Sequence, residues 1–530
     1  MINNKSTKYT PIIGLEIHAE LKTKSKMFCT CDNDAEGKPP NAAVCEVCTG
    51  QPGTLPVPNE QAIDWVILTG LALKSQIAKE TKFDRKNYYY PDLPKNYQIS
   101  QYDMPFCTKG YLEIKSDDPE AIRDKRVDIT RIHLEEDTGK LTHPKGSKKS
   151  QVDFNRSGTP LLELVSEPDI HTATEAKNFC TEFQKILRYL NVSNADMEKG
   201  EMRCEANISV QQTGKWRKKA SEIIPLKNYK LNPKVEIKNL NSFKSVEHAI
   251  QYEINRQTKL LDQGKEAEIV QETRGWDETK GVTFSQREKE SAHDYRYFPE
   301  PDIPPLKITE AKIKELKRKL PELPSAKRFR FINQYGFKYP DANILVSNPD
   351  LADYTEQVIA ELRTWLITTQ GTEGSKDEIW GANRKKVAKL VSGWLINKLG
   401  ALINEGDQTF GRLLADDKFK ITPENFAEFI TLIYENRINS ASAQEVLAIM
   451  FKKGSDPSHI MSENDLTQVS DEKELDVIIT EVINKNSEPV AQYKNGKEGA
   501  LMFLVGQVMK KTKGKANPEV VQKVLRERLK

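Results

Sequence analysis

The stretch "IIGLEIHAEL", Ile12 to Leu21, alternates strictly between apolar and polar residues. Successive side chains of a β-strand point to opposite faces, so the apolar residues share one face, and Glu16, His18 and Glu20 share the other. Exposure to solvent is enough to explain one such polar face, because antiparallel sheets often have one solvated side. The stretch therefore predicts a strand of an antiparallel sheet. Its Glu-His-Glu face is either solvent-exposed surface or part of a functional site.

Three other stretches carry the same alternation with the same kinds of polar residue. They are "ITRIHLEEDTGK" (129–140), "GEMRCEANISV" (200–210) and "KVEIKNLNSF" (234–243). Each places carboxylates beside Arg, His or Lys on one face of its strand. Together they predict a sheet with one face on the core and a charged, concave second face.

Carboxylates that cluster on one face repel one another unless cations neutralise them. Mg²⁺ accepts oxygen ligands, and Mn²⁺ is a second candidate ion because the face also offers an imidazole ligand. Arg203 and Lys238 suit phosphate oxygens, and a metal beside phosphate is what phosphoryl transfer requires. The sequence contains neither G-x-x-x-x-G-K-[ST] nor G-x-G-x-x-G, so we expect the sheet face to hold any nucleotide. A structural salt-bridge network is the alternative.

The composition predicts a soluble globular protein of two to four domains. The chain has 530 residues, of which 37% are hydrophobic, and a formal charge of only +3. Any contact with nucleic acid therefore has to come from local basic patches. The sequence has no apolar run of 18 residues and no apolar signal-peptide core at its N-terminus, so we expect a cytoplasmic protein without membrane contact.

The pattern of elements predicts an α+β fold followed by helices. We expect strands at 12–21, 127–135, 161–165, 201–210, 234–240 and 267–273, and helices at 60–77, 173–190 and 243–262. Strands and helices are not regularly interleaved, which favours an antiparallel sheet.

Four prolines in "FPEPDIPPL" (298–306) predict the end of this first domain, because proline interrupts both helices and central strands. We expect domains at 1–305, 306–410 and 411–530, the last two helical. The stretch at 368–378 reads as a flexible surface insertion.

Four of the seven cysteines lie close together, in the segment 29–48. Cys29, Cys31, Cys45 and Cys48 form C-x-C and C-x-x-C pairs separated by thirteen residues. This spacing favours a structural Zn²⁺ site, because four thiolates close a tetrahedral coordination sphere. Disulfides are the alternative, which a cytosolic chain disfavours.

The end of the chain is its most basic part. Residues 507–530 contain eight Lys or Arg and two Glu, a local charge of +6. A solvated helix accounts for such a tail, but the charge density favours contact with phosphates, and RNA is the natural partner.

Several of these motifs, read in order, make the chain recognisable. It resembles the B subunits of tRNA-dependent aspartyl/glutamyl amidotransferases in "IGLEIHAELKTKSKMFC", "FDRKNYYYPDLPKNYQISQYDMP", "HLEEDTGK", "NRSGTPLLELVSEPDI", "KNLNSF", "QETRGWDE", "HDYRYFPEPDIPPL" and "VGQVMKKTKGKANPEVV". The likeness runs nearly end to end. It implies an N-terminal catalytic cradle similar to the glutamine synthetase and guanido kinase fold, a helical domain and a C-terminal tRNA-binding tail.

The resemblance also implies an activity with partners. ATP phosphorylates the side-chain carboxylate of misacylated Glu-tRNA(Gln) or Asp-tRNA(Asn), and ammonia then displaces the phosphate. The ammonia comes from glutamine, which a separate amidase, the A subunit, hydrolyses, and the small C subunit holds the heterotrimer together. The choice between the two tRNA substrates stays open.

The site residues of the family are assigned to positions of this sequence by matching one motif at a time. The implied Mg²⁺ or Mn²⁺ ligands, also the implied catalytic residues, are Glu16, His18, one Glu of "HLEED", Glu205 and Glu236. Strand periodicity selects Glu135 in "HLEED", whereas the family match favours Glu136, which a bulge could re-aim. Phosphate contacts are expected from Arg203, Lys238 and Asn239. The four cysteines match zinc-bearing members, and the stretch at 211–233 looks longer than the family needs.

Two competing functions remain. The first is a non-catalytic zinc-ribbon RNA adapter, whose acidic faces are only salt-bridge networks. The adapter and the ligase subunit make different predictions for Glu16, His18 and Glu236, because an adapter needs no carboxylates that converge on one point. The second is the archaeal-type relative that acts on Glu-tRNA(Gln) only, whose synthetase-like insertion the sequence lacks.

Overall fold

The computed structural model describes residues 8–116, 124–144, 146–288, 295–370, 374–404, 410–415, 418–464, 466, 472–512 and 515–529. The chain divides into two compact units, Met1–Leu323 and Pro324–Lys530. The first combines sheets with helices, as the α+β prediction requires, and the described part of the second contains only helices.

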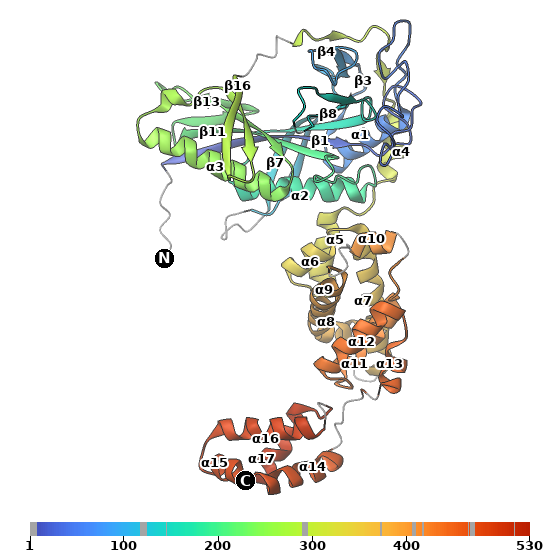
Figure 1. Ribbon diagram of the computed structural model, residues 1–530, viewed down its shortest axis with the longest axis vertical. Coiled ribbons are helices and arrows are strands. Elements are labelled where there is room, and N and C mark those ends of the chain that lie inside the picture. Colours follow the sequence, from blue (N-terminus) through green and yellow to red (C-terminus); the bar gives the residue numbers. More distant parts are fainter. Residues whose placement is uncertain are drawn as a thin grey trace. The chain divides into compact units, whose positions relative to one another are not determined.

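A nine-stranded sheet forms the centre of the first unit (Figure 1). Its strands run in the order β16-β15-β14-β11-β1-β10-β7-β6-β2, and all neighbours are antiparallel except β14 and β15. They are β1 (Tyr9–Glu20), β2 (Gln76–Ile77), β6 (Cys107–Ile114), β7 (Lys125–Glu136), β10 (Pro160–Ser166), β11 (Met202–Gln212), β14 (Val235–Leu240), β15 (Glu272–Asp277) and β16 (Val282–Glu288). The predicted strand at Ile12 is thus the middle one.

Short strands lie outside this sheet. They are β3 (Glu80–Thr81), β4 (Asp84–Asn87), β5 (Tyr97–Ser100), β8 (Lys140–Thr142), β9 (Gln151–Asp153), β12 (Trp216–Lys219), β13 (Glu222–Pro225), β17 (Phe298–Pro299) and β18 (Leu306–Lys307). β4 pairs with both β5 and β17, and β12 pairs with β13 to form a hairpin. The long stretch noted at 211–233 therefore contains this hairpin.

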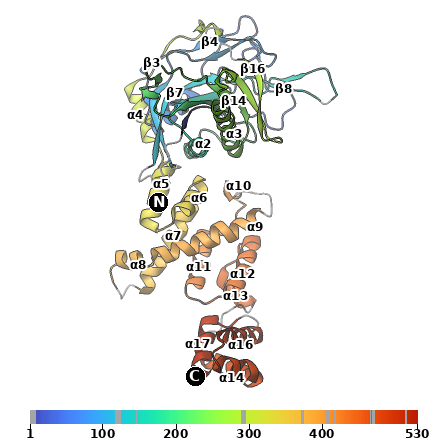
Figure 2. The ribbon, with the colours of Figure 1, turned by 90° about the vertical axis from the view of Figure 1, so that its left-hand side faces the viewer.

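Three helices pack on the apolar face of the large sheet: α1 (Glu60–Ala72), α2 (Ala173–Tyr189) and α3 (Phe243–Asp262). Each begins at a side chain that caps backbone N–H groups, namely Asn59, Thr172 and Ser242. Their apolar residues and those of β1 form one core. Figure 2 shows α2 and α3 together on one side of the sheet. The opposite face of the sheet is left for polar side chains.

Two predicted elements differ from the structure. The helix expected over 60–77 ends at Ala72, because Lys74 adopts a left-handed conformation with φ of 58° and residues 76–77 form β2. The strand expected over 267–273 lies later, at Glu272–Asp277, because a 3₁₀ turn occupies Glu266–Glu268. The other predicted strands and helices of this unit overlap the observed ones.

The first unit extends past the proline-rich segment, contrary to the boundary expected at 305. Helix α4 (Glu310–Arg318) belongs to the first unit, where Lys312 binds Asp64 of α1 with Nζ 2.8 Å from the carboxylate. Leu316 is buried in the first core, and Leu323 packs against it. The prolines therefore redirect the chain without ending the unit.

The second unit has two separate apolar cores. One contains buried residues between Phe331 and Met461, and the other contains buried residues between Leu475 and Leu529. The helices are α5 (Pro324–Arg330), α6 (Tyr339–Leu345), α7 (Pro349–Gln370), α8 (Lys376–Ser392), α9 (Gly400–Asn404), α10 (Phe410–Ala415), α11 (Pro423–Tyr434), α12 (Ser440–Lys453), α13 (Pro457–Glu463), α14 (Glu472–Lys485), α15 (Ser487–Lys494), α16 (Glu498–Lys511) and α17 (Pro518–Leu529), with π-helical segments at Phe331–Tyr335 and Gly393–Leu399.

The insertion predicted at 368–378 is mostly helical where it is described. Residues 368–370 end α7, and Ser375 caps α8 through a reciprocal pair of hydrogen bonds with Glu378. Residues 371–373 lie outside the described residues. Across the described parts of both units, no helix has the length and apolarity needed to span a bilayer.

Candidate active site and metal centres

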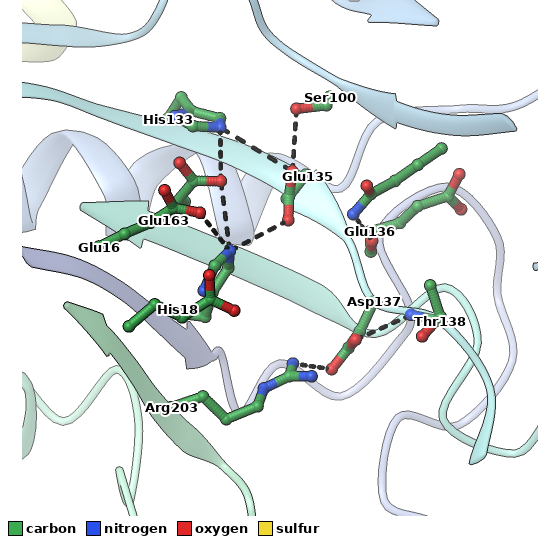
Figure 3. Close-up of polar contacts among 12 residues, drawn as sticks. Glu16, His18, Ser100, His133, Glu135, Glu136, Asp137, Thr138, Glu163 and Arg203 are labelled. Carbon is green, nitrogen blue, oxygen red and sulfur yellow. Dashed lines mark hydrogen bonds and ion pairs between the residues drawn. The ribbon is translucent and has the colours of Figure 1, made fainter. Parts of the chain in front are cut away.

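Carboxylates and imidazoles converge on the polar face of the large sheet (Figure 3). The Nε2 atom of His18 lies 3.3 Å from Glu163 and 3.7 Å from both Glu16 and Glu135. The Nε2 atom of His133 lies 3.3 Å from the same Glu163 oxygen and 3.9 Å from Glu135. We call these five residues the Glu/His cluster; Glu163 joins its two halves.

The cluster follows directly from the register of three strands. In β1, β10 and β7, His18 stands opposite Glu163, and Glu163 stands opposite His133. Glu16 and Glu135 are each two residues away on the same face, because side chains alternate along a strand. The Glu135 carboxylate also accepts a hydrogen bond from the Ser100 hydroxyl, at 2.9 Å.

Crowding shifts the protonation of the cluster. Burial and the negative charge of Glu163 raise the pKa of Glu16 to about 7. Burial alone would lower the pKa of His18, but hydrogen bonding to Glu163 and the nearby carboxylates raise it to about 9. Against the effect of burial, His133 and His18 hold the pKa of Glu163 well below its ordinary value. Without a metal, protons thus balance the charge of the carboxylates.

The structure places the two candidates of "HLEED" on opposite faces of β7. Glu135 lies in the cluster, as strand periodicity predicts. Glu136 points away from it, where Lys95 Nζ lies 2.5 Å from its carboxylate and the Ile99 N–H donates to it at 3.0 Å. The preference for Glu136 from the family match therefore disagrees with this geometry, because no bulge at Glu136 turns the side chain back.

Glu205 and Glu236 lie on neighbouring strands beside the cluster. Glu205 stands opposite Glu16 but forms an ion pair with Lys238, with Nζ 2.7 Å from the carboxylate. Glu236 is buried and accepts a hydrogen bond from the Thr273 hydroxyl at 2.8 Å. Among the described residues, the groups with ligand atoms within 4.8 Å of one another include Glu16, His18 and Glu135 but neither Glu205 nor Glu236.

The three expected phosphate contacts surround the same face. Arg203 pairs with Asp137 (Figure 3), and Lys238 pairs with Glu205. Asn239 is exposed and left-handed, with φ of 65°, at an irregularity in the pairing of β11 and β14. Both cations are therefore already partnered, and phosphate would have to compete with carboxylates for them.

Sequence reasoning assigned no role to two members of the cluster. The sequence places His133 on the charged face without a function, and Glu163 only in the motif "NRSGTPLLELVSEPDI" and in the strand expected at 161–165. A signal for Glu163 was present, since an isolated carboxylate inside an apolar strand requires a buried partner. Its location between two histidines depends on the pairing of β1, β10 and β7, which the sequence does not reveal.

A cavity of about 770 Å³ lies in the same unit. Its lining combines cations with aromatic and amide side chains: Lys86, Asn87, Tyr88, Tyr89, Tyr90, Lys238, Thr273, Gln286, Tyr295 and Arg296. Lys86 and Lys238 link it to the sheet face, because the charge of Lys86 acts on Glu135 and that of Lys238 on Glu16. This composition suits a ligand with both phosphates and a flat ring.

The four clustered cysteines form a second candidate metal centre. Their sulfur atoms all lie within 4.8 Å of one another, and none of the seven cysteines is in a disulfide. Tetrahedral Zn²⁺ with four thiolates places sulfur atoms roughly 3.8 Å apart, from Zn–S bonds of about 2.3 Å. The residues present therefore fit a Cys₄ zinc site. They are also held in place locally, since the Cys45 N–H donates to Cys48 Sγ at 3.2 Å.

Comparison with known proteins places the chain among relatives of nearly equal length. Residues 11–314 match the family model described as the GatB/GatE catalytic domain, and residues 378–529 match the GatB domain. The B subunit of the aspartyl/glutamyl-tRNA(Asn/Gln) amidotransferase of Caldanaerobacter subterraneus is 45% identical over 522 residues, which cover 98% of this chain and 99% of that protein. The chain belongs to this GatB family.

Other family members are equally similar. The proteins of the same name from Carboxydothermus hydrogenoformans and Thermotoga maritima are 44% and 43% identical, and each alignment covers 98% of this chain and 99% of the relative. The GatB/GatE catalytic-domain model spans every residue of the Glu/His cluster and all four clustered cysteines. Both candidate centres therefore lie in the part of the chain that the family model describes as catalytic.

Proposed function

We propose that the chain is the B subunit of an aspartyl/glutamyl-tRNA(Asn/Gln) amidotransferase and carries the phosphoryl-transfer centre on its sheet face. The observation that carries this proposal is the convergence of Glu16, His18, Glu135, Glu163 and His133 beside a cation-lined cavity. The names of the relatives supply the substrate class, which is tRNA charged with Asp or Glu.

The reaction has two steps, both at the side-chain carboxylate of the charged amino acid. First, the carboxylate oxygen attacks the γ-phosphorus of ATP and ADP leaves, which gives an acyl phosphate. Ammonia then attacks the carbonyl carbon, inorganic phosphate leaves with the C–O bond pair, and the proton that the nitrogen loses passes to the phosphate. Positioning and charge stabilisation supply most of the catalysis in such transfers.

The Glu/His cluster fits a hard divalent cation. It offers three carboxylates and two imidazoles, and His133 Nδ1 is a buried atom with no hydrogen-bond partner among the described residues. Mg²⁺ or Mn²⁺ bound there would supply charge neutralisation for the phosphoryl oxygens. In this proposal Glu16, His18, Glu135 and Glu163 hold the ion, and Glu205 and Glu236 support it from the adjacent strands.

The remaining site residues bind or orient the substrates. Arg203, Lys238 and Asn239 border the sheet face, so we assign them to phosphate contacts of ATP. The cavity beside them has room for the nucleotide base or the terminal adenosine of the tRNA, which its tyrosines would stack. The Cys₄ site is assigned to structural Zn²⁺, because four thiolates leave no open position for a substrate.

The ammonia has to come from a partner protein. We propose two partners, an amidase (the A subunit) and the small C subunit, with a cytoplasmic heterotrimer as the active form. We also propose that the cradle is of the glutamine synthetase and guanido kinase type, which the mostly antiparallel sheet with one polar face supports. A division of the helical part at 410 stays a proposal, and one apolar core extends across that position.

Transamidation by the reconstituted complex tests this function. The complex is supplied with ATP, glutamine, Mg²⁺ and either Asp-tRNA(Asn) or Glu-tRNA(Gln), and the released amino acid is analysed. We expect Asn or Gln to appear only when ATP is present. The RNA-adapter alternative predicts tRNA binding without ATP hydrolysis, so that result would replace the present assignment.

Metal binding to the cluster should strengthen as the pH rises. A metal requires neutral His18 and ionised Glu16, whose pKa values without metal are about 9 and about 7. Between pH 7 and 9 the ion displaces about one proton, so affinity should rise about tenfold per pH unit; below pH 7 it should fall more steeply. Titration with Mn²⁺ at several pH values measures this. His18→Ala should flatten the dependence between pH 7 and 9; a wild-type affinity independent of pH would contradict the proposed ligands.

The basic tail is proposed to contact tRNA phosphates, but its helices also form a core. α17 contributes Val521 and Leu525 to the apolar core that it shares with α14 and α16. Arg528 is paired with Asp476, and Arg526 with Glu498. Deletion of residues 507–530 would therefore unfold this module, and single lysines give a cleaner test.

Lys510→Ala should weaken tRNA binding modestly and reduce the salt dependence. Lys510 is exposed at the end of α16. Loss of one phosphate contact lowers the slope of log K against log salt by about 1. Filter binding at several salt concentrations measures both effects. Lys314→Ala, an exposed lysine of α4, is the matched control; equal slopes for both variants and the wild type would remove Lys510 from the interface.

A further inference from the structure

Lys86 is an unusual cation next to the Glu/His cluster. It lies on β4, is half-buried and lines the cavity of about 770 Å³. Its Nζ atom lies 5.3 Å from the centre of the Tyr295 ring and 5.9 Å from that of Tyr88. Within the described part of the chain it has no ion pair with a carboxylate, so aromatic rings and the open cavity surround its charge.

The other cations of the segment 82–95 are neutralised by direct contact. Lys82 lies 2.7 Å from Asp84, Arg85 lies 2.7 Å from Glu300, and Lys95 lies 2.5 Å from Glu136. Lys86 differs from them because it lies near the site and forms no ion pair with a described carboxylate. An ammonium that no carboxylate contacts directly keeps its N–H donors for another acceptor, so this arrangement points to an anionic ligand in the cavity.

The charge of the cluster explains why the lysine stays protonated. Burial alone would lower the pKa of Lys86, but Glu135, Tyr297 and Glu163 raise it well above its ordinary value. The cluster carries three carboxylates, and with neutral imidazoles one divalent cation plus Lys86 balances their charge. The ammonium thus lines the cavity and is attracted by two carboxylates of the cluster, Glu135 and Glu163.

We propose that Lys86 is a catalytic residue whose ammonium binds the phosphoryl group as it passes from ATP to the side-chain carboxylate of the aminoacyl-tRNA. This assignment rests on the proposed function. During the transfer, the bond from the γ-phosphorus to the bridging oxygen of ADP breaks, and the bond to the carboxylate oxygen forms. Negative charge spreads over the three equatorial oxygens, and Lys86 stabilises it. The lysine transfers no proton.

Tests of this role use the reconstituted complex with Lys86→Met, Lys86→Arg and the control Lys82→Met. Loss of one such contact lowers the rate by about 10²–10³-fold, so tRNA-dependent ATP hydrolysis by Lys86→Met should lose that much in kcat. The KM for aminoacyl-tRNA should change little. Lys86→Arg keeps the charge and should retain more activity, and Lys82→Met should resemble the wild type.

Metal affinity separates a catalytic role from a structural one. Removing a cation beside the cluster removes repulsion, so Lys86→Met should bind Mn²⁺ at least as tightly as the wild type. Slow turnover with intact Mn²⁺ binding supports the proposal. Weaker Mn²⁺ binding that accounts for the lost rate would overturn it, as would Lys86→Met with wild-type kcat.

A measurement on the wild-type complex covers the case in which Lys86→Met does not fold. ADP with aluminium fluoride mimics the transferring phosphoryl group, and with aminoacyl-tRNA it should slow acetylation of Lys86 compared with ADP alone. Lys79, whose side chain is 83% exposed, should not be protected. Unchanged labelling of Lys86 would overturn the proposal. A wild-type complex without tRNA-dependent ATP hydrolysis would instead overturn the proposed function and this role with it.

Discussion

Glu163→Gln should reduce tRNA-dependent ATP hydrolysis by at least 10²–10³-fold, the loss typical of removing one group that stabilises transition-state charge. Glu163 contacts both histidines of the cluster, each at 3.3 Å, so it links the two halves of the proposed metal site. Glutamine keeps the shape of the side chain but removes its negative charge, and the substitution therefore weakens metal binding most directly. Steady-state hydrolysis by the reconstituted complex measures the effect.

The same complexes provide the controls. tRNA binding and the partner's glutaminase activity should survive in Glu163→Gln, because both depend on residues outside the cluster. Glu167→Gln is the matched variant: Glu167 is also buried and next to β10, but it accepts a hydrogen bond from Thr130 at 2.6 Å and lies outside the cluster. Equal rates for the two variants would show that the cluster is a salt-bridge network, as the adapter alternative requires.

Cys45→Ser should cause the largest loss of stability. Zinc binding and local folding are coupled in Cys₄ sites, so loss of one thiolate should release about one Zn²⁺ per chain and unfold the segment 29–48. That segment is anchored to the rest of the first unit, since Asn155 accepts from the Ala43 N–H at 2.8 Å. We therefore expect a lower melting temperature for the first unit.

Elemental analysis and thermal melting measure this effect, with Cys107→Ser as the control. Cys107 is buried but distant in sequence from the cluster, so its variant should keep the zinc. Treatment of the wild type with a strong chelator should reproduce the melting temperature of Cys45→Ser. Metal-free wild-type protein with unchanged melting would contradict a structural zinc site.

Much of the fold follows from side-chain alternation. The strand at Ile12 and the strands carrying His133, Arg203 and Lys238 were predicted within a few residues, because each has one buried and one polar face. Alternation also selects Glu135 over Glu136. The family match favours Glu136, which lies on the opposite face because the strand is regular at that point.

The composition of the site depends on pairing between strands far apart in sequence. Glu163 stands next to His18 only because β10 lies between β1 and β7, an order that periodicity does not encode. For the same reason the separation of Glu236 from the cluster could not be foreseen. The boundary expected at 305 differs from the structure for another reason. Prolines indicate that the chain turns, but they do not indicate which core the following helix joins.

One measurement tests the central claim most directly: the fate of the side-chain oxygen of the aminoacyl-tRNA. Glu-tRNA(Gln) or Asp-tRNA(Asn) with ¹⁸O in its side-chain carboxylate is amidated by the complex with ATP and glutamine, and the released phosphate is analysed by mass spectrometry. If the carboxylate attacks the γ-phosphorus, each phosphate formed with the amide carries one ¹⁸O atom. Phosphate without ¹⁸O would contradict phosphorylation of the substrate, and with it the function assigned to the Glu/His cluster.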